Sequence, residues 1–193
     1  MKDEHETELE KRAKAMLKCL DSHEFRREKL LRPFIVEVTG LPDSGKSAIL
    51  KRIDIFFRRQ GSDGKECKIL IPQEGTEAVR NIPRSEFQHS IAASNYALQI
   101  LLKHSYSIDY DIIFFDRCLY NSWCFIEWLH RKKRLTQKES ECFKFYFTHE
   151  GWLKNIDVCF FVMCEPKVAV VRNKKDSFLT KKSGYRTNSE TMR

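Results

Sequence analysis

Eight consecutive residues in this sequence have the types and spacing needed to hold the phosphates of a nucleotide. The run Gly40-Leu41-Pro42-Asp43-Ser44-Gly45-Lys46-Ser47 fits the pattern G-x-x-x-x-G-K-[ST] at every fixed position. In this pattern the glycines let successive backbone N–H groups curl around phosphate oxygens, and the lysine reaches the β- and γ-phosphates. The serine hydroxyl is a ligand for Mg²⁺. We therefore expect a nucleoside triphosphate and Mg²⁺ to bind here, with contacts along the whole stretch from Gly40 to Ala48.

The residues on either side of this loop predict the strand and the helix that it needs. Pro33 to Thr39 is mostly apolar and β-branched, which is typical of a strand. Ala48 to Gln60 carries apolar residues at helical spacing and ends before Gly61. A helix that begins at the loop adds partial positive charge beside the phosphates. The context thus supports the motif.

Beyond the loop, apolar strands continue to alternate with helices. Strands are expected at residues 66–71, 110–117 and 158–163, and helices at residues 84–104, 119–131 and 136–151. This order predicts an α/β protein, a three-layer α/β/α phosphate-loop NTPase fold whose mostly parallel sheet is covered on both faces. Ligands of such sheets bind at the carboxyl ends of the strands. The residues expected to face one crevice there are Thr39, Glu74, Asp116 and Glu165.

The pair Asp116-Arg117 ends the predicted strand at residues 110–117. An acid at that position helps to hold Mg²⁺ beside Ser47. The guanidinium of Arg117 suits a clamp on a phosphoryl acceptor or on its phosphate, because it forms paired hydrogen bonds. The alternative is an ion pair on the surface. We expect Asp116 and Arg117 to be catalytic, and Asp116 and Ser47 to be the metal ligands.

These motifs together resemble the thymidylate kinase and deoxynucleoside kinase group of phosphate-loop kinases. The resemblance covers about residues 34–186 and implies transfer of the γ-phosphoryl group of ATP to a small acceptor, with Lys46 as a catalytic cation. By the same resemblance Glu74 is a base toward an acceptor hydroxyl, although it could instead cap a loop. The basic segment from Arg172 to Arg186 resembles a lid that brings cations, including Arg186, to the transferred phosphate. It could also be a solvated basic loop.

The sequence departs from this group at several positions. Thr39 and Pro42 stand where thymidylate kinases carry Glu and Asp, and Asn95 stands where they carry an acceptor-binding Arg. The lack of an arginine at position 95 counts against a monophosphate acceptor, whereas Thr39 and Pro42 remove only the group's own decoration of the loop. Relative to the group, the sequence is expected to lack the last helix and strand. Three aromatic residues are candidates for an acceptor pocket or for the core, namely Phe87, Tyr120 and Trp123.

Two other functions compete with a kinase. Asn173-Lys174-Lys175-Asp176 matches the guanine-reading pattern N-K-x-D, and Val168 to Val171 could be the strand before it. However, the connection from the strand at residues 158–163 is too short for a parallel crossover, and the GTPase pattern D-x-x-G is absent after Asp116. The other alternative is a nucleotide-binding regulatory module, an ATPase or GTPase-like switch that has no acceptor.

Residues 1–31 are expected to form a charged helical extension, and residues 32–193 a kinase-like domain. The extension carries a sparse apolar stripe of Leu9, Ala13, Met16 and Leu20 on a background of Glu, Lys and Arg. Such a helix could join two chains in a homodimer or bind a partner. Alternatively, it packs on the side of the domain.

The amino-acid composition limits which other partners and environments are expected. The net charge of +8 comes without a run of basic residues interleaved with aromatics, so nucleic-acid binding is not expected. The seven cysteines form no C-x-x-C pair and are expected to be reduced core residues of a cytoplasmic protein. No apolar run reaches about 18 residues, so no membrane span is expected. No structural metal is expected either.

Overall fold

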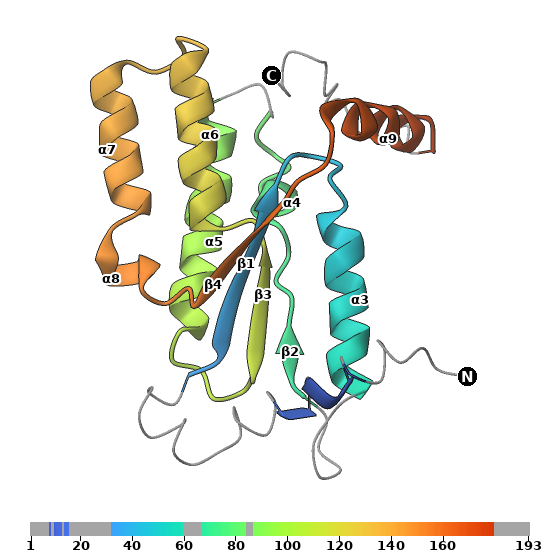
Figure 1. The fold of residues 1–193 in the computed structure, drawn as a ribbon. Helices are drawn as coiled ribbons and strands as arrows, with labels where there is room; N and C mark the ends of the chain where they lie inside the picture. Colours follow the sequence, from blue (N-terminus) through green and yellow to red (C-terminus); the bar gives the residue numbers. More distant parts are fainter. Residues whose placement is uncertain are drawn as a thin grey trace.

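A parallel sheet of four strands forms the centre of the molecule. The computed structural model describes residues 8, 10–12, 14–15, 32–59, 67–83 and 87–179, with side chains of the last stretch up to Arg172. The strands are β1 (Phe34–Gly40), β2 (Ile69–Leu70), β3 (Ile112–Asp116) and β4 (Val158–Val162). Their order is β2-β3-β1-β4, and every neighbouring pair is parallel (Figure 1). The carboxyl ends of all the strands therefore meet at one edge.

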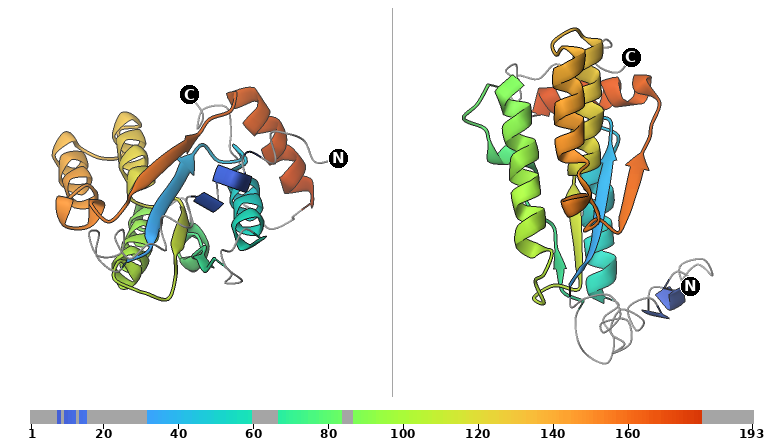
Figure 2. Two further views of the ribbon diagram at one scale, coloured as in Figure 1. Left: turned by 60° about the horizontal axis from the view of Figure 1, so that its bottom comes forward. Right: turned by 90° about the vertical axis from the view of Figure 1, so that its left-hand side faces the viewer.

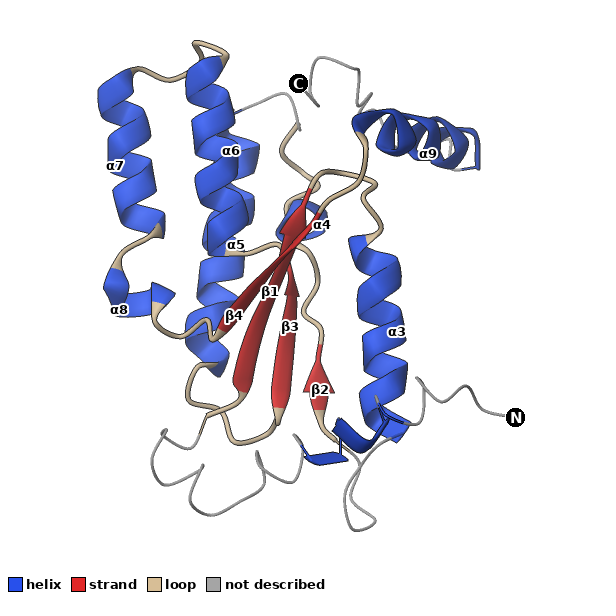
Figure 3. Cartoon of the chain, in the orientation of Figure 1, coloured by secondary structure: helices blue, strands red, loops and turns tan. Residues whose placement is uncertain are grey.

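Helices cover both faces of this sheet, which gives three layers (Figure 2, left). On one face lies α3 (Lys46–Arg59), and on the other lie α5 (Phe87–His104) and α6 (Leu119–Arg131). The helix α7 (Gln137–Phe147) runs beside α6 (Figure 3). The remaining helices are α4 (Gly75–Ala78), α8 (Glu150–Leu153) and α9 (Pro166–Leu179).

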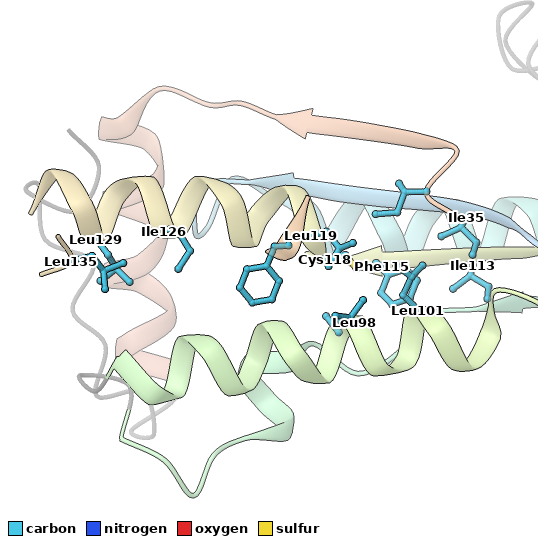
Figure 4. Close-up of a cluster of buried hydrophobic side chains, with 13 residues drawn as sticks. Ile35, Leu98, Leu101, Ile113, Phe115, Cys118, Leu119, Ile126, Leu129 and Leu135 are labelled. Atoms are coloured by element: carbon cyan, nitrogen blue, oxygen red, sulfur yellow. The ribbon is translucent and has the colours of Figure 1, made fainter. Parts of the chain in front are cut away.

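The alternation of side chains along β1 and β3 builds a core on each side of the sheet. Ile35 and Ile113 lie in the cluster that includes Leu98 and Leu101 of α5 and Leu119 of α6 (Figure 4). Their sequence neighbours Val36, Ile112 and Phe114 point the other way, toward α3. They belong to a second cluster with Val38, Leu50, Cys67 and Ile69. Both faces are apolar because a parallel sheet is buried on both sides.

Several predicted boundaries were wrong. The strand expected at residues 66–71 pairs only over Ile69–Leu70, and the short helix α4 after it was not predicted. The helix expected at residues 136–151 ends at Phe147. His149 then caps a separate helix, α8, because its ring nitrogen accepts the N–H of Gly151 at 3.0 Å.

The prediction that the cysteines are core residues was wrong for two of them. Cys67 and Cys118 are buried, but Cys124 and Cys142 are exposed. Apolar spacing along a helix does not reveal how much of that face a neighbouring helix covers.

The Leu9, Ala13, Met16 and Leu20 stripe lies outside the described residues, as does Cys19. In the described ranges, no helix has both the length and the apolar composition required to cross a bilayer.

Candidate active site

The loop between β1 and α3 has a backbone that few residues other than glycine can adopt. Gly40 and Gly45 have φ angles of 140° and 102°, and Asp43 has a φ of 57°. A Cβ on Gly40 would lie 2.2 Å from the carbonyl oxygen of Val162 in β4. At Gly40 both the φ angle and the close approach of β4 therefore exclude a side chain. Ser44 is buried in this loop, and its hydroxyl has no hydrogen-bond partner in the described part of the chain.

Lys46 is the first residue of α3 and its side chain turns back onto the loop. Its Nζ donates to the carbonyl oxygens of Gly40 at 3.2 Å and Leu41 at 2.7 Å. Burial, and then the positive charge of Arg117, lower the pKa of Lys46 to about 8. The ammonium of Lys46 is therefore partly desolvated and lies against the loop. A bound anion there would raise the pKa of Lys46 again, because it favours the charged form.

Ser47 and Asp116 are brought together although one begins α3 and the other ends β3. The Ser47 hydroxyl donates to Asp116 Oδ2 at 2.8 Å. Asp116 Oδ1 is buried and has no hydrogen-bond partner among the described residues. Burial, followed by the nearby charge of Glu74, raises the pKa of Asp116. The Ser47 hydroxyl and the Asp116 carboxylate, whose Oδ1 has no hydrogen-bond donor in the described ranges, offer the oxygen ligands that a hard cation such as Mg²⁺ prefers.

No three His, Cys, Asp or Glu side chains gather into a metal cage within the described ranges. A Mg²⁺ ion beside Ser47 and Asp116 would therefore take its other ligands from phosphate oxygens and water, as Mg²⁺ does in nucleotide sites.

Arg117, the residue after Asp116, forms an ion pair with Glu74. Arg117 has a φ of 68°, in the left-handed region, which an arginine adopts only when its surroundings hold it there. Glu74 is the N-cap residue of α4. The following residue, Gly75, lies so close to α5 that a Cβ would be 2.3 Å from the carbonyl oxygen of Ala93. Packing of α4 on α5 thus sets the position of Glu74.

Two residues of β1, Glu37 and Thr39, hold the start of α6, and of these Glu37 was not predicted from the sequence. Glu37 is fully buried, and its carboxylate accepts the backbone N–H groups of Cys118, Tyr120 and Asn121. Thr39, which was expected to face the crevice, is instead buried and donates to the side chain of Asn121 at 3.2 Å. A charged residue inside an apolar strand was the available signal, because such a group is rarely buried unless it is paired.

The helix α9 brings one further cation to the loop. Arg172 Nη1 lies 3.3 Å from the carbonyl oxygen of Ser44 and 3.4 Å from that of Asp43. Glu165 is exposed, and its carbonyl oxygen accepts the N–H groups of Val168 and Ala169 in the first turn of α9. Arg186 lies outside the described residues.

The guanine-reading motif does not have the strand that it needs. Val168 to Val171, considered as a strand before it, belongs to α9, as does the whole of residues 173–176. The residues from Pro166 to Leu179 are helical, so the alternation of strand and loop required for a guanine pocket is absent from this described stretch.

The aromatic candidates for an acceptor pocket divide into two groups. Phe87 and Tyr120 are partly buried and pack against the cluster between the sheet and α5. Trp123 is 40% exposed and lies beneath the ammonium of Lys144, 5.0 Å from the ring centre. Asn95 is exposed, and its side-chain oxygen accepts the hydroxyl of Tyr146 at 3.3 Å.

Comparison with known proteins shows which known fold this chain shares. No protein-family model matches the chain, and no curated protein matches it. Among solved structures, a deoxyadenosine kinase from M. mycoides, determined with the products dCMP and a flexible dCDP, superposes with a TM-score of 0.52. The two sequences are 19% identical, and the match covers 74% of this chain and 70% of that chain. This chain therefore has the three-layer α/β/α fold of the phosphate-loop kinases, as the resemblance of its motifs predicted.

Proposed function

We propose that this protein is a Mg²⁺-dependent kinase that transfers the γ-phosphoryl group of ATP to a hydroxyl group of a nucleoside-like acceptor. The observation that carries the proposal is the meeting of Lys46, Ser47 and Asp116 with the Glu74–Arg117 pair at one end of the sheet. This end combines a phosphate loop with a carboxylate and a guanidinium, those of Glu74 and Arg117. A module that only binds nucleotide does not require this pair. Residues 32–193 are proposed to act as one catalytic unit.

Each residue has a distinct task in this proposal. The backbone N–H groups between Gly40 and Ala48, except at Pro42, which has none, and the ammonium of Lys46 hold the phosphates and stabilise charge on the transferred group. Mg²⁺, when held by Ser47 and Asp116, neutralises charge on the phosphate oxygens.

On the acceptor side, Arg117 orients the acceptor and Glu74 takes the proton of its hydroxyl. The bond from the acceptor oxygen to the γ-phosphorus forms as the bond from that phosphorus to the ADP oxygen breaks. Arg172 supplies further positive charge at the loop, and Arg186 is assigned the same task only by the resemblance of its segment to a kinase lid.

The runner-up is a nucleotide-binding regulatory module without an acceptor. It is favoured by Asn95, which replaces the acceptor-binding arginine of thymidylate kinases and whose oxygen accepts the hydroxyl of Tyr146. A hydroxyl acceptor does not need that arginine, so Asn95 is also consistent with a nucleoside kinase.

The deciding experiment separates nucleotide binding from transfer. A thermal-shift screen of nucleosides and other small hydroxyl acceptors with Mg²⁺-ATP selects an acceptor, and transfer to it is then measured for the wild type, Arg117→Ala and Asp116→Ala. We expect Arg117→Ala to lower kcat about 100-fold or more while ATP affinity, measured by calorimetry, changes less than about threefold. Asp116→Ala should lower both transfer and Mg²⁺-dependent ATP binding.

Arg134→Ala is the matched control for loss of an arginine, because Arg134 is exposed in the turn before α7. If no acceptor supports transfer and Arg117→Ala behaves as the wild type does, the regulatory function replaces the kinase.

A further inference from the structure

Glu37 occupies an unusual place for a charged side chain. It lies in the middle of β1, which is paired with β3 on one side and β4 on the other, and its exposed fraction is 0%. Transfer of a carboxylate from water into such a place is costly unless hydrogen bonds replace its hydration. Burial raises the pKa of Glu37, and the backbone hydrogen bonds oppose that rise. The cost implies that the carboxylate does something an apolar residue could not.

The hydrogen bonds of Glu37 all go to the start of α6. Its Oε1 accepts the N–H groups of Cys118 at 2.9 Å and Asn121 at 2.8 Å, and its Oε2 accepts that of Tyr120 at 3.0 Å. The first N–H groups of a helix have no partner within the helix, and a negative charge beside them is stabilising. Cys118, the N-cap residue, makes no side-chain cap of its own. Glu37 therefore caps α6 from a strand more than 80 residues earlier in the chain.

This cap lies next to the turn between β3 and α6, residues 116–118, which carries Arg117. Asp116 ends β3, Cys118 precedes α6, and Arg117 is the residue between them. The N–H of Arg117 donates to the carbonyl oxygen of Val38 at 3.1 Å. With Glu37 binding Cys118, β1 thus holds two consecutive N–H groups of the turn. This double hold accounts for the left-handed φ of 68° at Arg117, which directs its side chain to Glu74.

We propose that Glu37 is a positioning residue for phosphoryl transfer. By capping α6 it holds Arg117 in its strained conformation and so keeps the guanidinium beside Glu74, on the acceptor side of the site. This role rests on the proposed kinase function. It also gives the start of α6 a buried anion of its own, so the substrate phosphates are left to the loop and to α3.

The test uses Glu37→Gln, which keeps the shape of the side chain and places an NH₂ group against the N–H of Tyr120. The matched control is Val36→Ala, the neighbouring β1 residue, which is buried in the cluster facing α3. Transfer, ATP affinity and amide hydrogen exchange are measured for the wild type and both variants. Arg117→Ala and the double variant Glu37→Gln/Arg117→Ala complete a double-mutant cycle.

We expect Glu37→Gln to lower kcat about tenfold or more and to change ATP affinity less than about threefold, because its effect passes through Arg117. In the Arg117→Ala background the same substitution should change kcat less than about twofold. Exchange at Cys118, Tyr120 and Asn121 should accelerate about tenfold, and Val36→Ala should leave these amides protected even if it lowers the thermal midpoint. An equal loss of kcat in both backgrounds would overturn the proposal.

Two further outcomes keep the test decisive. If Glu37→Gln does not fold, exchange in the wild type decides: these amides should exchange far more slowly than those of Gln137 and Lys138 at the exposed start of α7, and equal rates would overturn the cap. If the wild type transfers phosphate to no acceptor, only the proposed function fails. Loss of exchange protection in Glu37→Gln then upholds the positioning of the turn, and retained protection overturns it.

Discussion

The carboxylate of Glu74 and the guanidinium of Arg117 form an ion pair across the carboxyl ends of β2 and β3, 43 residues apart in the chain. Both side chains are about one-fifth exposed, at 21% and 22%. The proposed base and the proposed acceptor clamp are therefore one unit, partly shielded from water. A substrate hydroxyl that binds there meets both groups at once.

Replacing Glu74 tests whether it is a base or only a partner of Arg117. If it takes the acceptor proton, Glu74→Gln should lower kcat about 100-fold to 10,000-fold, since Gln cannot accept a proton. Glu77→Gln is the control, because Glu77 lies on α4 with an exposed side chain paired to Arg80. Steady-state kinetics with the selected acceptor provide the measurement. A kcat for Glu74→Gln within about threefold of the wild type would exclude the base role.

Lys46 is expected to be essential for both nucleotide binding and turnover. Lys46→Ala removes the ammonium that the loop carbonyls hold in place and should cost about 3 kcal/mol or more of transition-state stabilisation, seen in kcat/KM. Lys51→Ala, which removes an exposed lysine of the same helix, is the control. Undiminished ATP affinity together with undiminished turnover in Lys46→Ala would contradict the phosphate-binding assignment.

The two loop glycines should differ when each is changed to alanine. Gly40→Ala forces a Cβ to within 2.2 Å of the Val162 carbonyl and should cost more than about 3 kcal/mol of unfolding free energy, because β1 and β4 must separate. At Gly45 the nearest atom would be Arg172 Nη1 at 3.6 Å, so only the strain of a φ of 102° remains, about 1 to 3 kcal/mol. Denaturant unfolding of both variants measures the difference, and equal losses would count against the close approach of β4.

Acid stability should depend on the contact between α6 and α7. Hydrogen bonds from Lys144 and then Arg131 lower the pKa of Glu127 from 4.5 to about 2. Because the folded pKa is the lower one, the ionised carboxylate contributes stability that is complete above about pH 4.5 and is lost as the pH falls through about 2.

The thermal midpoint of the wild type should therefore fall across this window more steeply than that of Glu127→Gln. Lys144→Gln should flatten the same part of the profile, since it removes the main partner. Parallel profiles for the wild type and Glu127→Gln would show that the ion pair does not act on stability.

The sequence alone determined the parts of the site that depend on neighbouring residues. The phosphate loop, the strand before it and the helix after it lie within one stretch, so glycine spacing and apolar periodicity were enough to predict them. Asp116 and Arg117 could be assigned to a strand end for the same reason. The parallel sheet followed from the alternation of strands and helices.

Only the tertiary structure decided the contacts between distant segments. Glu37 appeared as one acid in an apolar strand, and its role became visible only when α6 was placed over β1. The position of Glu74 depends on Gly75 packing against Ala93, and the approach of Arg172 to the loop depends on where α9 lies. A sequence pattern reports which face of an element is apolar. It does not report which element packs there, because that is decided by the combined packing of segments far apart in the chain.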